Sequence, residues 1–262
     1  MDSVVFSKVA RVTILTLVLI ALIFLKERFP DKKEKEDALY LQDFEDMTVD
    51  QHWFSPALLV IEDERNSEGL ILRQNYVPSS TGTPFIGKRF KLRESVREAT
   101  LTFDMKIDPG FEFVKGGKLH GLGGGSATTG CKSIDPDGWS VRLMWRQEGK
   151  PVLYIYDQER KKRCGDNVET PSNFTFERGV WYTVSLSVKL NSAVGSSDGA
   201  ASLFINREKL IEINSLNLTG NMDSAIDCFM YNSFYGGNDP SWSPTKEAYI
   251  FFDNFQVKGG SF

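Results

Sequence analysis

The chain has 262 residues, 12% of them aromatic, and a formal net charge of −4 at pH 7. This length allows one large domain or two small ones, and the aromatic content is sufficient for a large core. The acidic balance argues against general nucleic-acid binding, so any site for a polyanion must be a local basic patch.

An uncharged and almost wholly apolar run lies near the N-terminus, at residues 12–25. As a helix it would span about 21 Å, which is shorter than the ~30 Å hydrocarbon core. Basic residues flank it on both sides, and their side chains can snorkel and extend the span. No small-residue cleavage pattern follows. The sequence therefore predicts a signal anchor at residues 1–28, a single transmembrane helix that leaves the remaining chain lumenal or extracellular. A secreted protein is the alternative.

Mixed charges occupy residues 31–37 and indicate a solvated linker, which we assign to residues 29–39. The folded domain is then expected over residues 40–262. Helical patterns are scarce in it, whereas apolar alternation between turn residues is common. This organisation favours an all-β sandwich.

The clearest strand pattern lies at residues 99–107, where apolar residues alternate with polar ones. A turn at Asp108–Gly110 follows it. Further strands are expected at residues 43–45, 69–73, 181–190, 201–205 and 248–257.

Residues 111–125 continue from this turn and contain two lysines, Lys115 and Lys118, among six glycines. Glycine removes side-chain bulk and permits backbone angles that other residues avoid. We interpret the segment as an open surface that displays two ammonium groups in a groove, which suits a long anionic ligand. A solvated basic loop is the alternative interpretation.

Two alternating runs, at residues 139–146 and 152–157, are separated by a turn and predict a β-hairpin. Pairing the two runs would place a serine, two arginines and two tyrosines on one face of the sheet: Ser140, Arg142, Arg146, Tyr154 and Tyr156. The alternative is an ordinary solvated face whose tyrosines reflect β propensity.

The chain has three cysteines and two N-glycosylation sequons, at Asn173 and Asn217. Together with the N-terminal run, the sequons fit a secretory route, where an oxidising compartment permits one disulfide. A bridge between Cys131 and Cys164 would tie together the two loops that flank the hairpin. Three buried thiols in a cytosolic protein are the alternative.

Several motifs, taken in order, resemble those of polysaccharide lyase family 14. Residues 115–122 resemble its Lys-Gly-Gly-Lys-Leu-Pro-Gly-Leu signature, with His120 in the place of the proline. Ser140-x-Arg142 and Tyr154-x-Tyr156 resemble two further pairs of the family, and residues 236–242 and 252–255 resemble its last strands. The resemblance covers roughly residues 44–257.

The resemblance implies a concanavalin-like β-jelly roll of two antiparallel sheets whose concave face binds uronate chains. It also implies that a lysine of the glycine-lysine motif and the tyrosine pair take part in catalysis, with the serine and arginine beside them. The catalytic candidates are therefore Lys118, Lys115, Tyr154 and Tyr156. The candidates for substrate binding are Ser140, Arg142, Arg146, His120 and Trp242, the last from a loop suited to stacking on sugars.

Uronate lyases cleave the 4-O-glycosidic bond of a polyuronate, such as alginate or a glucuronan, by β-elimination. Arg142 could hold the uronate carboxylate in a bidentate pair. Either lysine could neutralise it or act as base, and either tyrosine could protonate the departing oxygen or, as tyrosinate, act as base. The sequence does not separate these assignments, although we favour Lys118 over Lys115.

No cofactor is expected, and a structural calcium ion at Asp253 has only one carboxylate in its favour. The expected partners are an acidic polysaccharide and, through the N-terminal helix, the membrane. Two other functions stay open. One is a lectin-like, membrane-anchored domain that binds carbohydrate without turnover, and the other is a structural surface domain.

Overall fold

Two antiparallel sheets carry the fold, in the part of the chain that the computed structural model describes, residues 36–45, 53 and 55–260. The predicted signal anchor at residues 1–28 lies outside this part, as does most of the predicted linker. Within the described residues, no helix combines the length and the apolarity needed to cross a membrane.

The eight-stranded sheet has the strand order β12-β11-β10-β5-β15-β3-β2, and β1 pairs with β15 beside β3. Every pair of these strands is antiparallel. The strands are β1 (Tyr40–Gln42), β2 (Leu58–Asp63), β3 (Asn66–Tyr76), β5 (Glu98–Ile107), β10 (Trp181–Lys189), β11 (Gly199–Ile205), β12 (Glu208–Leu216) and β15 (Ala248–Gly259).

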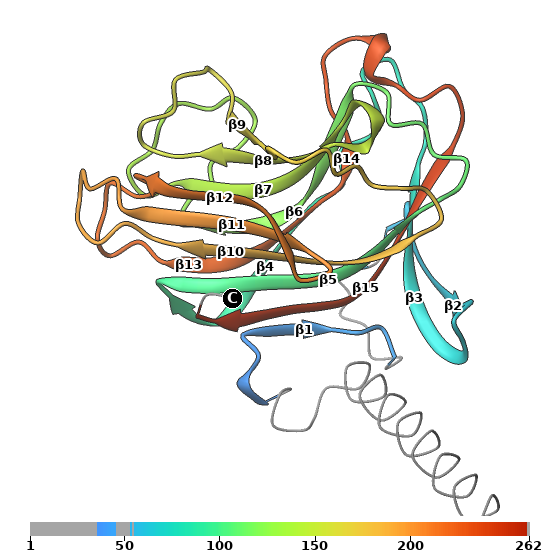
Figure 1. Ribbon diagram of the computed structural model, residues 1–262, viewed down its shortest axis with the longest axis horizontal. Coiled ribbons are helices and arrows are strands. Elements are labelled where there is room, and N and C mark those ends of the chain that lie inside the picture. The colour runs from blue at the N-terminus through green and yellow to red at the C-terminus, as the bar shows by residue number, and fades with distance from the viewer. Residues whose placement is uncertain (1–35, 46–52, 54, 261–262) are drawn as a thin grey trace, which may run out of the picture. The chain divides into compact units, whose positions relative to one another are not determined.

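The seven-stranded sheet has the order β4-β13-β6-β7-β8-β9, and β14 pairs with β6. These strands are β4 (Gly87–Val96), β6 (Gly116–Gly124), β7 (Trp139–Arg146), β8 (Pro151–Tyr156), β9 (Asp166–Glu169), β13 (Ile226–Asn232) and β14 (Phe234–Tyr235). Two 3-10 helices lie in the connections, η2 (Gln147–Gly149) and η3 (Pro240–Trp242). Figure 1 shows the loop after β8 and the loop after β14 at opposite ends of this sheet.

One hydrophobic core fills the space between the sheets. The predicted alternation in β5 is confirmed, because Leu101, Phe103, Met105 and Ile107 are all buried in this core. From the seven-stranded sheet, every second residue of β7 points into this core, including Trp145, and these core residues alternate along the strand with the predicted site residues. Burying one face of each sheet in this way makes a sandwich, the jelly-roll-like architecture that the sequence predicted.

The structure corrects two local predictions. The first edge strand is β1, and residues 43–45 follow it without strand structure. The glycine-lysine segment is neither the open surface predicted nor the solvated basic loop that was the alternative, because Gly116–Gly124 forms the largely buried central strand β6 between β13 and β7. Its glycines therefore serve close packing on both faces of a sheet, and only its flanks lie in loops.

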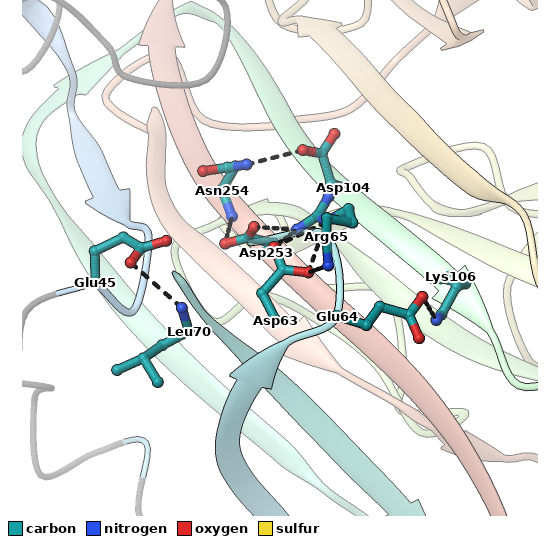
Figure 2. A network of polar contacts seen from close by, with 9 residues as sticks. All are labelled: Glu45, Asp63, Glu64, Arg65, Leu70, Asp104, Lys106, Asp253 and Asn254. Atoms are coloured by element: carbon teal, nitrogen blue, oxygen red, sulfur yellow. Dashed lines mark hydrogen bonds and ion pairs between the residues drawn. The ribbon is translucent and has the colours of Figure 1, made fainter. Parts of the chain in front are cut away.

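A network of charges lies on the eight-stranded sheet, which is the sheet opposite the predicted site (Figure 2). Arg65, in the β2–β3 turn, pairs with Asp63 at 2.8 Å and Asp253 at 2.7 Å, and its guanidinium lies 3.7 Å from the Trp181 ring centroid. Burial raises the pKa of Asp253 to about 7, and Asp104 adds to the shift while Arg65 opposes it. The network ties the turn to β15.

The carboxylate of Asp253 thus has Arg65 as its partner. Among the described residues, no group of three or more His, Cys, Asp or Glu side chains is arranged to hold a metal ion. The geometry at Asp253 therefore does not fit the structural calcium ion considered from the sequence.

Candidate active site

A β-bulge in β6 decides which of its side chains face the site. Lys118 lies opposite Met144 of β7, whereas Gly121 lies opposite Arg142, so β6 has one more residue than β7 over this stretch. Regular alternation would put residue 120 on the same face as Lys118. The extra residue shifts the alternation and turns His120 into the core instead.

His120 is completely buried between the sheets, with 0% of its surface exposed. Its ring stacks on Tyr231 at 4.3 Å and meets the edges of Phe103 and Phe252. Neither ring nitrogen makes a hydrogen bond of regular geometry, and the backbone of Asn232 is its polar neighbour. Burial therefore holds the pKa of His120 well below its usual value. The predicted substrate contact of His120 is wrong, because the bulge directs this side chain away from the outer face.

The outer face of the seven-stranded sheet gathers the other residues of the motifs. Tyr154 lies opposite Arg142 in the β7–β8 register, as the predicted hairpin requires. The Arg142 guanidinium lies 5.4 Å from the Tyr154 ring centroid and 5.6 Å from that of Tyr156. The Lys118 amine is 5.7 Å from the Tyr154 ring, and Arg146 donates a 2.9 Å hydrogen bond to Asn167. These side chains form one cationic and aromatic surface.

Arg142 is the buried charge of this surface. Its side chain belongs to a residue that is only 3% exposed, and its Nε–H has no hydrogen-bond partner. Burial lowers the pKa of Arg142 to about 10, the positive charge of Arg89 adds to the shift, and the two tyrosines oppose it. Among the described residues, no carboxylate pairs with it. A buried cation without a partner is costly, so the site is built to receive an anion.

Lys118 is half-buried and lies beside two guanidinium groups. Burial lowers the pKa of its amine to about 8, and the positive charges of Arg142 and Arg146 add to the shift. A substantial fraction of the amine is therefore neutral in mildly alkaline solution. Such a lysine can accept a proton, whereas an ordinary exposed lysine remains charged.

The two tyrosine hydroxyls lie 3.4 Å apart and each accepts a backbone hydrogen bond. Gly165 donates to Tyr154 at 3.0 Å, and Cys131 donates to Tyr156 at 3.1 Å. Burial raises the pKa of Tyr154 to about 12, and its hydrogen bond with Tyr156 adds to the shift. Tyr154 is therefore protonated near neutral pH and suited to donate a proton.

Glycines allow this close packing. A Cβ atom on Gly121 would lie 2.1 Å from the Val141 carbonyl oxygen and 2.7 Å from Cγ of Arg142. A Cβ atom on Gly236, in the loop after β14, would lie 2.1 Å from Nζ of Lys118. The contacts at Gly121 include backbone atoms, so a side chain there would force the backbone or Arg142 to move, whereas a side chain on Gly236 would displace the flexible end of Lys118.

Lys115 and Trp242 form a separate group near the end of β6. Lys115 is exposed, donates a hydrogen bond to Ser241, and lies 5.7 Å from the Trp242 ring. Trp242 is part of η3 and packs over Gly237. Trp242 belongs to the loop after β14, whose Gly236 contacts Lys118, whereas Lys115 directly precedes β6 and lacks the buried, cationic surroundings of Lys118.

Ser140 lies on the predicted face of the sheet but is not accessible to a ligand. It is completely buried, and its hydroxyl donates a 2.8 Å hydrogen bond to the Thr128 carbonyl. It thus fastens the loop of residues 125–138 to the site and is covered from solvent. Two further residues of the site were not among the candidates, namely Met144, which packs with both tyrosines, and Gly165. Met144 lies midway between Arg142 and Arg146, so the alternation of the strand already placed it on the same face. No local sequence pattern indicated that Gly165 belongs to the site.

The predicted disulfide between Cys131 and Cys164 is present, and Cys228 is a buried free thiol. The two sequons differ. Asn173 is exposed, and its glycosylation remains a prediction. Asn217 is 7% exposed, and its side-chain amide accepts a hydrogen bond from Asn191. Asn217 is thus largely covered in the folded chain, and its glycosylation also remains a prediction.

Comparison with known proteins places this surface in context. A family model described as Polysaccharide lyase 14 matches residues 72–255, while no curated protein sequence matches significantly. Three solved structures illustrate the similarity of fold. An alginate lyase from Aplysia kurodai has 20% sequence identity and a TM-score of 0.68, over 85% of this chain and 99% of its own.

An alginate lyase from a Chlorella virus has 23% identity and a TM-score of 0.64, over 77% of this chain and 88% of its own. An endo-β-1,4-glucuronan lyase from the fungus Trichoderma reesei has 13% identity and a TM-score of 0.56, over 86% and 92% of the two chains. At these identities the likeness establishes the fold, and the matched residues contain the whole surface around Arg142.

Proposed function

The chain belongs to polysaccharide lyase family 14, and we propose that it cleaves a polyuronate by β-elimination at the 4-O-glycosidic bond. One observation carries the proposal. Arg142 is a buried guanidinium without a carboxylate partner among the described residues, and further cations surround it. An anionic sugar supplies the missing charge. Alginate and glucuronan are the candidate substrates, because they are the polymers named for the structurally similar lyases.

Arg142 binds the uronate carboxylate through its planar fork of N–H donors. When the proton at C5 leaves, negative charge spreads into this carboxylate. A guanidinium fixed in a water-poor site stabilises that charge where it develops. Arg146, which is half-buried beside it, lies within the same cationic surface and is assigned to binding.

Lys118 takes the C5 proton, because its lowered pKa of about 8 leaves a neutral amine available. The electron pair of the C5–H bond forms the C4–C5 double bond as the C4–O4 bond breaks. Tyr154, whose pKa of about 12 keeps it protonated, donates its proton to O4. The net change is one proton moved from C5 to O4, so no water is consumed. Tyr156 holds the second hydroxyl beside Tyr154 and is the alternative donor.

The test is to incubate the folded domain with polymannuronate, polyguluronate and glucuronan and follow the absorbance of the unsaturated product. We expect activity on at least one polymer, a loss of about 100-fold or more in kcat for Lys118→Ala, and a smaller change for Lys115→Ala. Lys115 is the matched control, because it is a lysine of the same motif that lacks the buried surroundings. Full activity of Lys118→Ala would refute the assignment of the base.

A lectin-like carbohydrate-binding domain is the second candidate, and the burial of the tyrosines favours it. Tyr156 is 1% exposed and Tyr154 is nearly covered, so a bound sugar must displace covering groups to reach their hydroxyls. In this case the surface would bind polyuronates without turnover. Retained binding with no product on any of the three polymers would support this function over the first.

We further infer that residues 1–28 anchor the domain in a membrane, with the domain lumenal or extracellular, or that the chain is secreted. The disulfide supports a compartment that is oxidising. Alkaline extraction of expressing cells separates the two cases, because an anchored chain stays with the membranes. Release of the intact chain into the medium would contradict the anchor and support secretion.

A further inference from the structure

The two backbone N–H groups that bind the tyrosine hydroxyls belong to loops joined by the disulfide. Cys131 lies in the loop of residues 125–138 and donates to Tyr156 at 3.1 Å. Gly165, in the loop of residues 157–165, donates to Tyr154 at 3.0 Å. Cys131 is itself one half of the bridge, and Gly165 is the next residue after the other half, Cys164.

We propose that the Cys131–Cys164 bridge positions the tyrosine pair, by holding two backbone donors on the two phenolic oxygens. The proposal rests on the proposed function, because it concerns the proton donor of the same reaction. The bridge residues and Gly165 are positioning residues, since they act through the tyrosines.

The bridge lies directly against the rings that it positions. Cys164 packs on the cluster of Met144, Tyr154 and Tyr156. Gly165 approaches as closely as its lack of a side chain allows, because a Cβ atom there would lie 2.7 Å from the Tyr156 ring and 2.9 Å from the Tyr154 ring. The loop is therefore fitted to the tyrosines and does not merely pass near them.

Cys131 adopts a backbone conformation that a residue with a side chain rarely takes, with φ at 63°. This left-handed conformation costs about 1–2 kcal/mol for most residues, so the surroundings must hold it. It turns the Cys131 N–H toward Tyr156. The covalent link to Cys164 is the strongest restraint on this residue. A second link is Arg160, which donates to the Lys132 carbonyl at 2.7 Å and lies over the Tyr156 ring.

The donors also set the chemistry of the pair. An N–H that donates to a phenolic oxygen stabilises the tyrosinate and leaves the O–H proton free to point elsewhere. The hydrogen bond from Gly165 thus lowers the pKa of Tyr154 against the raising effect of burial. If the bridge opens, the pKa of Tyr154 should rise and its hydroxyl should lose its orientation toward the substrate.

The test compares the wild-type protein with the double variant C131S/C164S, which keeps both backbone N–H groups and removes only the bond. We expect kcat to fall by about 10- to 100-fold, because reacting groups lose their alignment. KM should change little, since Arg142 and Lys118 are held by β7 and β6. The alkaline limb of the pH profile of kcat should move to higher pH.

Three further samples separate positioning from general stability. G165A keeps the bridge but pushes the loop off the rings, so it should shift the profile in the same direction. A dithiol reductant, whose two electrons convert the bridge into two thiols, should impair the wild-type protein and leave C131S/C164S unchanged. Cys228→Ala retains the bridge, and it should keep the wild-type profile and the response to the reductant.

Two readouts do not depend on turnover. Amide hydrogen exchange at residues 131 and 165 should speed up when the bridge is absent, and spectroscopic titration should show a higher pKa for Tyr154, identified by its loss in Tyr154→Phe. An unchanged titration and pH profile in C131S/C164S would overturn the inference while leaving the proposed function intact. If the wild-type protein cleaves no polyuronate, the proposed function fails, and exchange and titration still decide whether the bridge positions the tyrosines.

Discussion

His120→Leu tests whether the bulge in β6 turns His120 into the core while Lys118 faces the site. Leucine has nearly the volume of histidine and suits the apolar pocket formed by Tyr231, Phe103 and Phe252. Because both ring nitrogens lack a regular partner, their removal should gain about 1–3 kcal/mol. The changed shape should cost less than about 1.5 kcal/mol. We therefore expect a variant at least as stable as the wild type at about pH 8.

The stability advantage of His120→Leu over the wild type should increase as the pH is lowered. The unfolded chain has a histidine pKa of about 6.5, whereas burial holds the folded value well below this. Between these two pKa values the unfolded state binds a proton on His120 and the folded state does not, so the free energy of unfolding falls as pH falls below about 6.5. The slope is about 1.4 kcal/mol per pH unit. His120→Leu has no such proton to bind and should lack this part of the acid destabilisation.

Urea unfolding at a series of pH values measures this difference, with the wild type and the variant in the same buffers. Activity on the preferred polyuronate is measured in parallel, and its pH profile should be unchanged because His120 faces the core. A stability difference that is constant from about pH 5 to 8 would refute the buried, neutral histidine. A large loss of kcat in a stable variant would instead return His120 to the site.

Three other changes test separate parts of the structure. Gly121→Ala should cost about 1–3 kcal/mol of stability and reduce kcat/KM by displacing Arg142, whereas Gly259→Ala, which has open space around its Cβ, should change neither. Between about pH 4 and 7, Asp253 is protonated in the folded state but not in the unfolded state, because its folded pKa is raised to about 7. The free energy of unfolding of the wild type should therefore fall as pH rises through this range, and Asp253→Asn should not show this fall. Wild-type kcat should rise with pH through about 8 as Lys118 loses its proton, and Lys118→Ala should lack this limb. Equal unfolding curves for Gly121→Ala and Gly259→Ala would contradict the close packing at Gly121. The raised pKa of Asp253 would be contradicted if Asp253→Asn and the wild type had the same pH dependence of stability. The role of Lys118 as base would be contradicted if kcat of Lys118→Ala still rose with pH through about 8.

The sequence predicted the sandwich and the hairpin because both depend on simple alternation. In β5 and β7, every second side chain is apolar, and a period of two fixes which face is buried. The same rule placed Arg142, Arg146, Tyr154 and Tyr156 on one face, as observed. The family motifs added the relation between this hairpin and Lys118, which lie on different parts of the chain.

Alternation failed where the backbone departs from it. The bulge between Lys118 and Gly121 inserts one residue, and no local pattern in a glycine-rich strand announces it. His120 was therefore assigned to the wrong face. Ser140 lies on the predicted face but is covered by the 125–138 loop, and loop packing depends on contacts far apart in sequence. Asn217 is a similar case, since its burial depends on Asn191.

We propose above that the surface around Arg142 cleaves a polyuronate with Lys118 as the base. The most direct test of this proposal is the initial rate of unsaturated product formed from polymannuronate, polyguluronate and glucuronan by the wild-type protein, Lys118→Ala and Lys115→Ala, at about pH 8 to 9. We expect product from the wild type on at least one polymer, a rate at least about 100-fold lower for Lys118→Ala, and a much smaller loss for Lys115→Ala. No product on any of the three polymers, or equal rates for Lys118→Ala and the wild type, would contradict it.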